Sequence, residues 1–389
     1  MTDYLQEARD MQPQLSDWRR DFHRNPELSL EETRTAEIVA QHLKRLDVNV
    51  KTGVGGTGVV GLIDGNRPGP TVLLRLDMDA LPIQEENNTE YVSQFPGKMH
   101  ACGHDGHTAM GMGAATLLSR HRQEFSGKVM LIFEPAEETS QGAQAMIEAG
   151  ILIDNPPDYS ISLHIEPQIP AGKFGISGGP VRAAADRFRC VVKGKGGHGA
   201  EPHNTVDPIA VTAQIINALQ TIVSRNVGPL DTAVVSIGSL HAGQAFNIIP
   251  EHLEFEGTIR TYKKNTQKIV HNKLRKIIEG TASMMGATAE LEIIDMIPAI
   301  VNDQAVADMV RQAANQLVGP GNIVTDQRST VSDDAGYFLQ AAPGCYFSLG
   351  AGRLDNIIPL HSPHFDWDES AMPLGVALLC SAATRLLQQ

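Results

Sequence analysis

A cysteine and a histidine separated by a single glycine lie within the segment Met99–Asp105. Thiolate sulfur and imidazole nitrogen are natural ligands for zinc and similar ions. With glycine between them, Cys102 and His104 can turn toward one point if the backbone bends there. A C-x-H triplet is common, however, and buried cysteine is usually structural. The triplet alone is therefore a weak indication of a metal site.

Two adjacent carboxylates, Glu137 and Glu138, follow the apolar run 128–133. In open α/β sheets, active sites gather at the C-terminal ends of strands. Adjacent carboxylates can divide the work there, because one can bind a metal ion while the other takes a proton from metal-bound water. The alternative is a solvated acidic turn, which is usual for a Glu-Glu pair. The position after an apolar strand favours an active site.

Two histidines can complete such a site. His164 ends the apolar run that begins at Tyr159, and His361 precedes Ser362-Pro363. Either histidine alone would more often be a satisfied structural residue. Five ligands of suitable chemistry could, however, hold two ions about 3.5–4 Å apart that share a bridging hydroxide. One site explains them better than five coincidences.

Alternating apolar and amphipathic segments predict the scaffold that positions these residues. The runs 58–63, 71–76, 128–133 and 159–165 read as buried strands, with helices near 107–121 and 142–149. This alternation is typical of an α/β sheet covered on both faces. Ser29–Glu32 resembles a capping box that begins an early helix. The last part of the chain returns to α/β character and ends in a helix near 375–387.

A different pattern occupies the middle of the chain. Strands are predicted at 187–195, 232–240, 251–262 and 287–294, with helices at 207–225 and 265–285. Their order matches a split-βαβ, ferredoxin-like domain. We therefore predict a catalytic domain in two parts, 1–183 and 296–389, interrupted by an inserted domain at 184–295.

Composition limits the partners and the compartment. The formal charge of −13 over 389 residues argues against a nucleic-acid partner, because phosphate binding needs a basic surface. No apolar run of about 18 residues predicts a membrane span, and the first residues do not resemble a secretory signal. Four scattered cysteines fit a reduced, cytoplasmic protein.

The motifs taken together resemble the aminoacylase-like amidohydrolases, which include hippurate hydrolases, N-acetyl-diaminopimelate deacetylases and auxin-conjugate hydrolases. The resemblance covers nearly the whole chain. The motifs that carry it are Leu74–Pro82, Met99–His104, Glu134–Glu138, Gly196–Ala200 and His361–Pro363.

That resemblance implies a di-metal exopeptidase-like catalytic domain with a mixed central sheet, and roles for individual residues. It implies that Glu137 is the general base, that Asp79 orients the metal site, and that Asn247 and Arg260 bind the substrate carboxylate or the developing charge. It also implies that the inserted domain forms a homodimer in which His198 reaches the neighbouring subunit's site and stabilises the oxyanion. The implied metal ligands are Cys102, His104, Glu138, His164 and His361.

The implied reaction is hydrolysis of N-acyl amino acids by a hydroxide that bridges two divalent ions. Zinc or manganese suits the ligands, with cobalt and nickel as alternatives. Relatives commonly carry Ser-Glu-Asp-Phe where this chain has Ser332-Asp333-Asp334-Ala335. The shorter acid and the missing ring put the family's usual substrate preference in doubt.

Three other functions compete with this interpretation. A dipeptidase or carboxypeptidase could use the same di-metal site, and a binding protein could keep the fold without activity. A serine hydrolase is a further candidate, because Gly175–Gly179 fits the G-x-S-x-G pattern around Ser177. That pattern needs a helix directly after the serine. Gly178-Gly179-Pro180 does not favour one, so we expect a crossover into the inserted domain instead.

Overall fold

The structure is a computed structural model that describes residues 2–353 and 357–389. The chain forms two compact units. The first comprises the chain up to Val181 together with Val301–Arg328 and Asp333–Gln389. The second comprises Arg182–Ile300 with Ser329–Ser332. One stretch of chain thus interrupts the first unit, as in an inserted domain.

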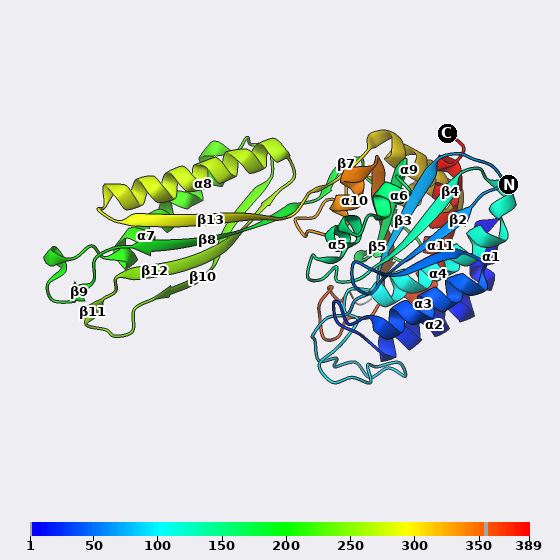
Figure 1. Ribbon diagram of the computed structural model, residues 1–389, viewed down its shortest axis with the longest axis horizontal. Coiled ribbons are helices and arrows are strands. Elements are labelled where there is room, and N and C mark those ends of the chain that lie inside the picture. Colours follow the sequence, from blue (N-terminus) through cyan, green and yellow to red (C-terminus); the bar gives the residue numbers. More distant parts are fainter. Residues whose placement is uncertain (1, 354–356) are drawn as a thin grey trace. The chain divides into compact units, whose positions relative to one another are not determined.

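An eight-stranded mixed sheet lies at the centre of the first unit (Figure 1), in the order β1-β2-β4-β3-β5-β16-β6-β15. Neighbouring strands β4, β3, β5 and β16 run parallel, so their C-terminal ends meet at one edge. That edge is where catalytic residues of α/β sheets gather. The strands are β1 Asn49–Val54, β2 Gly58–Asp64, β3 Thr71–Asp77, β4 Lys128–Glu134, β5 Tyr159–Pro170, β6 Phe174–Gly175, β15 Ile323–Val324 and β16 Gly344–Gly352.

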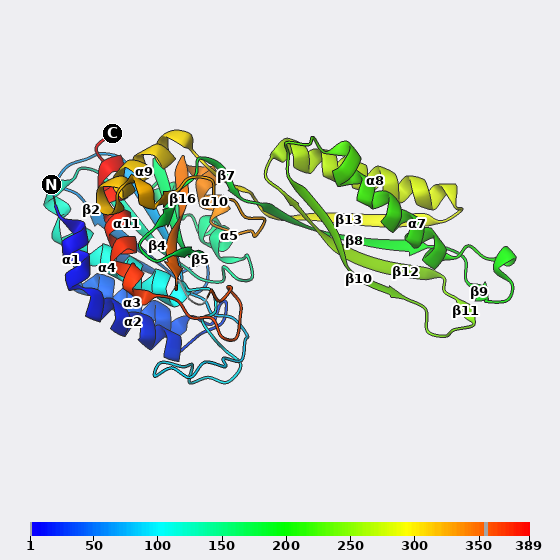
Figure 2. The same cartoon turned by 180° about the vertical axis from the view of Figure 1, so that it is seen from behind.

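Helices cover both faces of this sheet because alternate side chains of its strands are apolar on both sides. Leu74 and Leu76 of β3 face the larger core, whereas Leu73 faces a smaller core with Met146 and Phe338. Figure 2 shows the helices from behind. They are α1 Tyr4–Asp10, α2 Gln12–Arg24, α3 Thr33–Arg45, α4 His104–Arg120, α5 Gly142–Glu148, α6 Ile151–Asp154, α9 Gln304–Val318, α10 Gly336–Ala341 and α11 Met372–Leu386.

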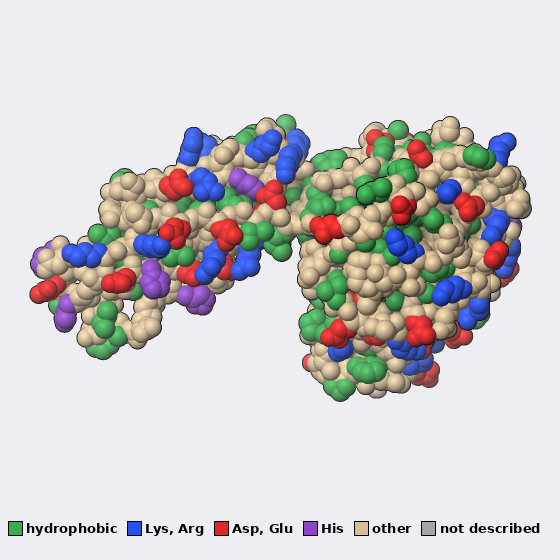
Figure 3. Space-filling model, viewed as in Figure 1, with side chains coloured by type: hydrophobic (Ala, Val, Ile, Leu, Met, Phe, Trp, Pro, Cys, Tyr) green, Lys and Arg blue, Asp and Glu red, His purple; other side chains and the backbone are tan. Residues whose placement is uncertain are grey.

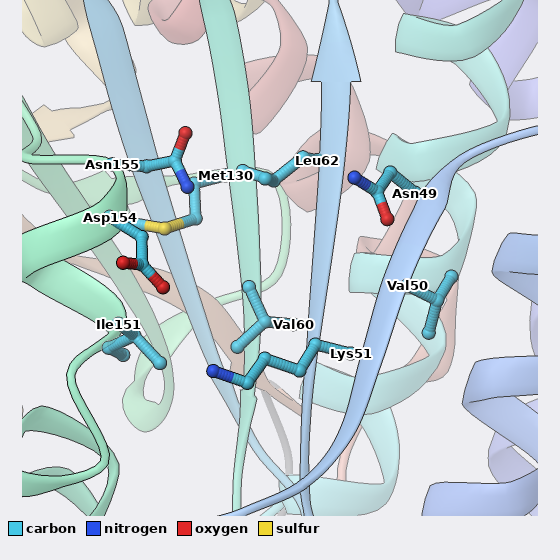
Figure 4. Close-up of a pocket in the computed structure, with 9 residues that line it drawn as sticks. All are labelled: Asn49, Val50, Lys51, Val60, Leu62, Met130, Ile151, Asp154 and Asn155. Atoms are coloured by element: carbon cyan, nitrogen blue, oxygen red, sulfur yellow. The ribbon is translucent and has the colours of Figure 1, made fainter.

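A cavity of about 380 Å³ lies between α6 and strands β1, β2 and β4 (Figure 4). Val60 and Met130 contribute apolar surface to it, and Lys51 and Asp154 contribute charged groups. None of the candidate site residues lines this cavity. The cavity is therefore separate from the predicted metal site.

The second unit is a four-stranded antiparallel sheet with two helices on one face, in the strand order β10-β12-β8-β13. With its β-α-β-β-α-β connectivity, this is the predicted split-βαβ arrangement. Phe188, Phe255 and Leu274 lie in its core. The elements are β8 Ala184–Lys193, β9 Gly197–His198, α7 Pro208–Thr221, β10 Ala233–Ala242, β11 Ile248–Ile249, β12 His252–Thr261, α8 Lys264–Met284 and β13 Thr288–Ile297.

The strands of the second unit also carry charged side chains on exposed positions. Arg187 pairs with Glu256, and Arg189 pairs with Glu254 across β8 and β12. Figure 3 shows acidic and basic side chains interspersed over this unit. Cross-strand ion pairs of this kind keep a sheet face solvated and discourage apolar association.

Several expectations differ from the structure. Ser29–Glu32 is not a capping box, because the N-cap residue Glu32 makes no side-chain bond to the start of α3. The Ser29 hydroxyl instead donates to Asp79 Oδ2 at 2.7 Å. Helix α4 begins at His104, three residues earlier than the start predicted near 107. Strand β16 was not recognised individually within the C-terminal part.

The G-x-S-x-G pattern does not form a nucleophile elbow. Ser177 is buried between the short strands β6 and β7 (Gly179–Arg182), and β7 pairs with β14 (Ile300–Asn302). The Ser177 hydroxyl oxygen accepts a bond from the Gln327 backbone N–H at 2.8 Å. No helix follows the serine, so the structure removes the ground for a serine hydrolase. Among the described residues, we find no helix long and apolar enough to cross a membrane.

Candidate active site

Cys102 and His104 flank a glycine in a left-handed conformation. Gly103 has φ +92° and is the N-cap of α4, so His104 is the first residue of the helix. An added Cβ on Gly103 would lie 3.0 Å from the Ile165 side chain and would also be strained at this φ. The bend brings the ligand atoms of Cys102 and His104 together with that of His164, all within 4.8 Å of one another.

The remaining predicted ligands lie beside the same cysteine. Cys102, Glu138 and His361 form a second group whose ligand atoms are within 4.8 Å of one another. His361 Nε2 lies 3.4 Å from Glu138 Oε2, and the His361 backbone N–H donates to Ala101 O at 2.8 Å. Cys102 thus belongs to both groups. The five predicted ligands, distant in sequence, converge on one place.

Glu137 lies beside the same donor atoms, although it is not one of the five predicted ligands. Its Oε2 lies 4.0 Å from His104 Nε2, and it forms a group with His104 and Glu138. Both glutamates lie in the loop between β4 and α5, and their side chains are about nine-tenths buried, with 11% and 9% exposed. This loop is not a solvated acidic turn.

Hydrogen bonds orient the two buried histidines. His104 Nδ1 lies 2.9 Å from the backbone carbonyl of Asp79, and His164 Nδ1 lies 2.6 Å from that of Ile165. A carbonyl accepts only, so each Nδ1 carries a proton, and in the neutral form of the ring each Nε2 presents a lone pair. His164 Nε2 faces Cys102 Sγ at 3.5 Å. Both rings are therefore arranged as metal ligands through Nε2.

His107 has the chemistry of a ligand but a different role. Its Nδ1 lies 2.6 Å from Asp77 Oδ1, and its Nε2 accepts the backbone N–H of Ile165 at 2.9 Å. Both ring nitrogens are thus occupied. His107 connects the end of β3 to β5 directly beside His164, and so holds that ligand in place.

Two orphaned polar atoms test whether the site fits divalent ions. His104 Nε2 and Glu138 Oε1 are buried and have no hydrogen-bond partner among the described residues. Leaving such atoms unpaired would be costly unless a cation completes their coordination. Sulfur, nitrogen and carboxylate donors suit zinc and related ions. The residues present therefore fit a metal centre.

The charges in the site favour a bound positive charge. Burial lowers the pKa of His104, but Asp77 and Cys102 outweigh it and raise that pKa well above its usual value. Burial raises the pKa of the Cys102 thiol, and Glu138 raises it further. Burial likewise raises the pKa of Glu137, with Asp333 and Glu138 adding to the effect. A divalent cation would compete with these protons and favour the ionised carboxylate.

A buried cluster next to the site was not foreseen from the sequence. Arg75, fully buried in β3, pairs with Glu134 and lies 2.7 Å from Asp77, 3.2 Å from Asp333 and 3.1 Å from Asp334. One arginine thus joins four carboxylates around the strand ends. The departure Asp333-Asp334 lies in this cluster. In the sequence, the only sign of this cluster is an arginine within the apolar strand Thr71–Asp77.

The three predicted residues of the second unit do not all lie together. His198 in β9 pairs with Ile248 in β11, next to Asn247. Arg260 is near the other end of β12, eight residues from His252 or roughly 26 Å along the strand. Its guanidinium contacts Thr258 and the Ile259 carbonyl. One copy of this unit thus presents these residues at two separate places.

Comparisons with known proteins agree with the fold and the donor set. Residues 73–385 match the model of peptidase family M20/M25/M40. Thermostable carboxypeptidase 2 of Saccharolobus solfataricus is 41% identical, over 96% of each chain. N-acetylcysteine deacetylase of Bacillus subtilis is 38% identical, over 96% of this chain and 97% of the relative. The crystal structure of a dinuclear metal-binding M20 peptidase from Bacillus subtilis superposes with a TM-score of 0.87 at 35% identity, over 97% and 99% of the two chains.

Fold, donor set and relatives together define a metal-dependent hydrolase of amide bonds. The chain belongs to peptidase family M20/M25/M40. The resemblance to the aminoacylase-like amidohydrolases is confirmed at the level of this family. The roles of individual residues stay predictions.

Proposed function

We propose that this protein hydrolyses N-acyl amino acids, with Glu137 as the general base beside two divalent cations. The position of Glu137 carries the proposal. Its carboxylate lies 4.0 Å from His104 Nε2 within the donor group, while the adjacent Glu138 supplies a separate ligand oxygen. One carboxylate is thus free to move a proton where the other binds metal.

Cys102, His104, Glu138, His164 and His361 would hold the cations. Zinc or manganese suits this mixture of donors, and cobalt or nickel could replace them. When bound, divalent cations lower the pKa of water and polarise an amide carbonyl. Asp79 keeps the donors in place, because its Oδ2 accepts the Glu138 backbone N–H at 3.0 Å.

Glu137 then performs the proton transfers. It takes a proton from the water that attacks the amide carbon, and it delivers that proton to the leaving nitrogen. The C–N bond breaks, and a carboxylic acid and a free amino acid result. Because burial and neighbouring acids raise the pKa of Glu137, it holds the transferred proton well enough to pass it on.

Residues of the second unit would complete the site in a homodimer. His198, next to Asn247, is exposed and therefore available to another copy of the chain. In this proposal His198 stabilises the oxyanion of the neighbouring subunit's site, while Asn247 and Arg260 hold the substrate carboxylate. The separation of His198, in the two-stranded sheet of β9 and β11, from Arg260, in β12 of the four-stranded sheet, supports supply by two copies.

A carboxypeptidase or dipeptidase activity is the second candidate. It is favoured by the relative named a thermostable carboxypeptidase, which is similar over 96% of this chain. Both reactions cleave an amide next to a free carboxylate with the same machinery. A substrate panel distinguishes them: the proposal expects N-acetyl-methionine and hippurate to be cleaved at higher kcat/KM than simple dipeptides.

Separate substitution of each of the two adjacent glutamates tests the mechanism. We expect Glu137→Gln to keep its metal but to lose roughly 10²–10⁴-fold in kcat, because it removes the proton acceptor. Glu138→Gln should lose metal instead. Glu148→Gln, at the exposed end of α5, is the control and should match the wild type. Substantial turnover by Glu137→Gln would remove Glu137 from its role.

A further inference from the structure

The loop that carries Glu137 and Glu138 has an unfavourable backbone conformation. Ala136 has φ +54° and Ser140 has φ +60°, in the left-handed region that non-glycine residues rarely adopt. Each such conformation is strained and persists only when its surroundings enforce it. Ala136 immediately precedes Glu137, so its conformation sets the direction in which the Glu137 side chain leaves the backbone.

Three buried carboxylates from distant parts of the chain each accept one backbone N–H of this region. Glu32 Oε1 accepts from Ala136 at 2.8 Å, and Asp79 Oδ2 accepts from Glu138 at 3.0 Å. Asp334 Oδ2 accepts from Ala143 at 3.1 Å. Glu137 therefore lies between two fixed points of the backbone, one on each side.

Glu32 is a buried carboxylate whose hydrogen bonds run to three places in the chain. It is fully buried directly before α3, yet it does not cap that helix. Its Oε1 also accepts the Leu30 N–H at 3.0 Å, and its Oε2 accepts the Thr57 hydroxyl. Burying a carboxylate is costly even when it is hydrogen-bonded. Its contacts hold the carboxylate in a single position, with Ala136 as the partner nearest the candidate site.

We propose that Glu32 is a positioning residue that holds Ala136 in its left-handed conformation and thereby directs Glu137 toward the donor group. This rests on the proposed function, because it takes Glu137 to be the general base. Glu138 has its own contact at Asp79 Oδ2, so loss of the Glu32 contact should disturb the base more than the metal ligand. The signature is a fall in kcat with KM and metal content preserved.

Substitutions at Glu32 test its hydrogen bond with the Ala136 N–H. We expect Glu32→Ala to lose roughly tenfold to a hundredfold in kcat, the effect of a small misplacement of a reacting group, with KM within about threefold. Glu32→Gln keeps an acceptor oxygen for Ala136 and should restore kcat to within about threefold of the wild type. Thr57→Val removes only the contact on the opposite oxygen of Glu32, and it is the matched control that should keep kcat.

A substitution at Ala136 separates positioning from stability. Glycine accepts a positive φ, so Ala136→Gly in the Glu32→Ala background relieves the strain at residue 136 and restores the thermal unfolding temperature, while the Glu32 contact stays absent. Positioning predicts that kcat falls while stability does not. A purely structural contribution of Glu32 predicts that kcat follows stability in every variant.

Two results with Glu32→Ala would overturn the proposal. Folded, metal-loaded Glu32→Ala with wild-type kcat would overturn it, and so would loss of metal as the main effect. Should Glu32→Ala not fold, the double variant Glu32→Ala/Ala136→Gly decides, and wild-type kcat in that variant would overturn the proposal. Failure of the proposed function is distinguishable, because it appears as turnover by Glu137→Gln.

Discussion

Two neighbouring glutamates illustrate how contacts, rather than residue type, divide chemical roles. Glu138 has its backbone fixed by Asp79, and its carboxylate lies beside Cys102 and His361. Glu137 faces His104, and burial together with the nearby Asp333 raises its pKa. In the proposed function, the same side chain therefore binds metal at one position and transfers a proton at the next.

Cys102 belongs to both donor groups, so its removal should affect metal binding more than any other single change. We expect Cys102→Ala to lose most of its bound metal and its activity after dialysis, as measured by elemental analysis. Cys345→Ala is the matched control, because Cys345 is also buried but lies within β16 and outside both donor groups. Full metal content in Cys102→Ala would contradict the predicted ligand set.

Metal binding should also release protons. The pKa values of the Cys102 thiol and of His104 are both raised well above their usual values, so both groups hold protons that a divalent ion must displace. We expect the apparent affinity for zinc to fall as the pH is lowered. Calorimetric titration in buffers of different ionisation enthalpy measures the release directly, and a count of zero would contradict this prediction.

Among the elements, α3 contains a histidine whose burial opposes protonation. His42 is buried, with its Nε2 3.1 Å from the Met112 carbonyl and 3.0 Å from the Thr116 hydroxyl oxygen of α4. Burial lowers its pKa to about 4. The unfolded chain, with an ordinary pKa near 6.5, therefore takes up this proton first as the pH falls.

This difference predicts a loss of stability between about pH 6.5 and pH 4. Above that window the residue is neutral in both states and contributes no pH dependence. At pH 5 the folded state should be destabilised by about 2 kcal/mol relative to pH 8 through this residue alone. Urea unfolding of the wild type and of His42→Gln at both pH values isolates the effect. An identical pH dependence in the two proteins would contradict it.

The elements of the fold were predictable where they are long and strongly patterned. The strands around Leu74, Leu131 and Ile161 are continuous apolar runs, and the second unit shows clear alternation. Strand β16 was not recognised, because a short apolar run beside a helical region is ambiguous without its neighbours. Ser29 and Glu32 imitate a helix cap in sequence, but tertiary contacts take both side chains elsewhere.

The candidate site was predictable as a set of donors, but its supporting residues were not. Cys102 and His361 could be named from chemistry and motif. The contact of Arg75 with Asp334, by contrast, joins residues 259 positions apart. Asp334 lies in a turn shortly before α10, and only the packing of the folded chain brings that turn to Arg75 in β3.

At the scale of the whole molecule, the proposed dimer predicts that each active site contains residues of both subunits. Glu137→Gln and His198→Ala should each be inactive as homodimers. Co-refolded in equal amounts, they should regain about a quarter of wild-type activity, because half of the dimers are mixed and each mixed dimer holds one intact site. No recovery would show that His198 serves the site of its own chain. Sedimentation of the wild type as a dimer is the accompanying check.

The second unit begins and ends on neighbouring strands. Ala185 of β8 lies opposite Ile297 of β13, so the points where the chain enters and leaves this unit are adjacent. Because its two ends are adjacent, such a segment can be removed or replaced with only a short gap in the chain left to close. The second unit can therefore be exchanged between relatives as one piece while the rest of the chain is kept.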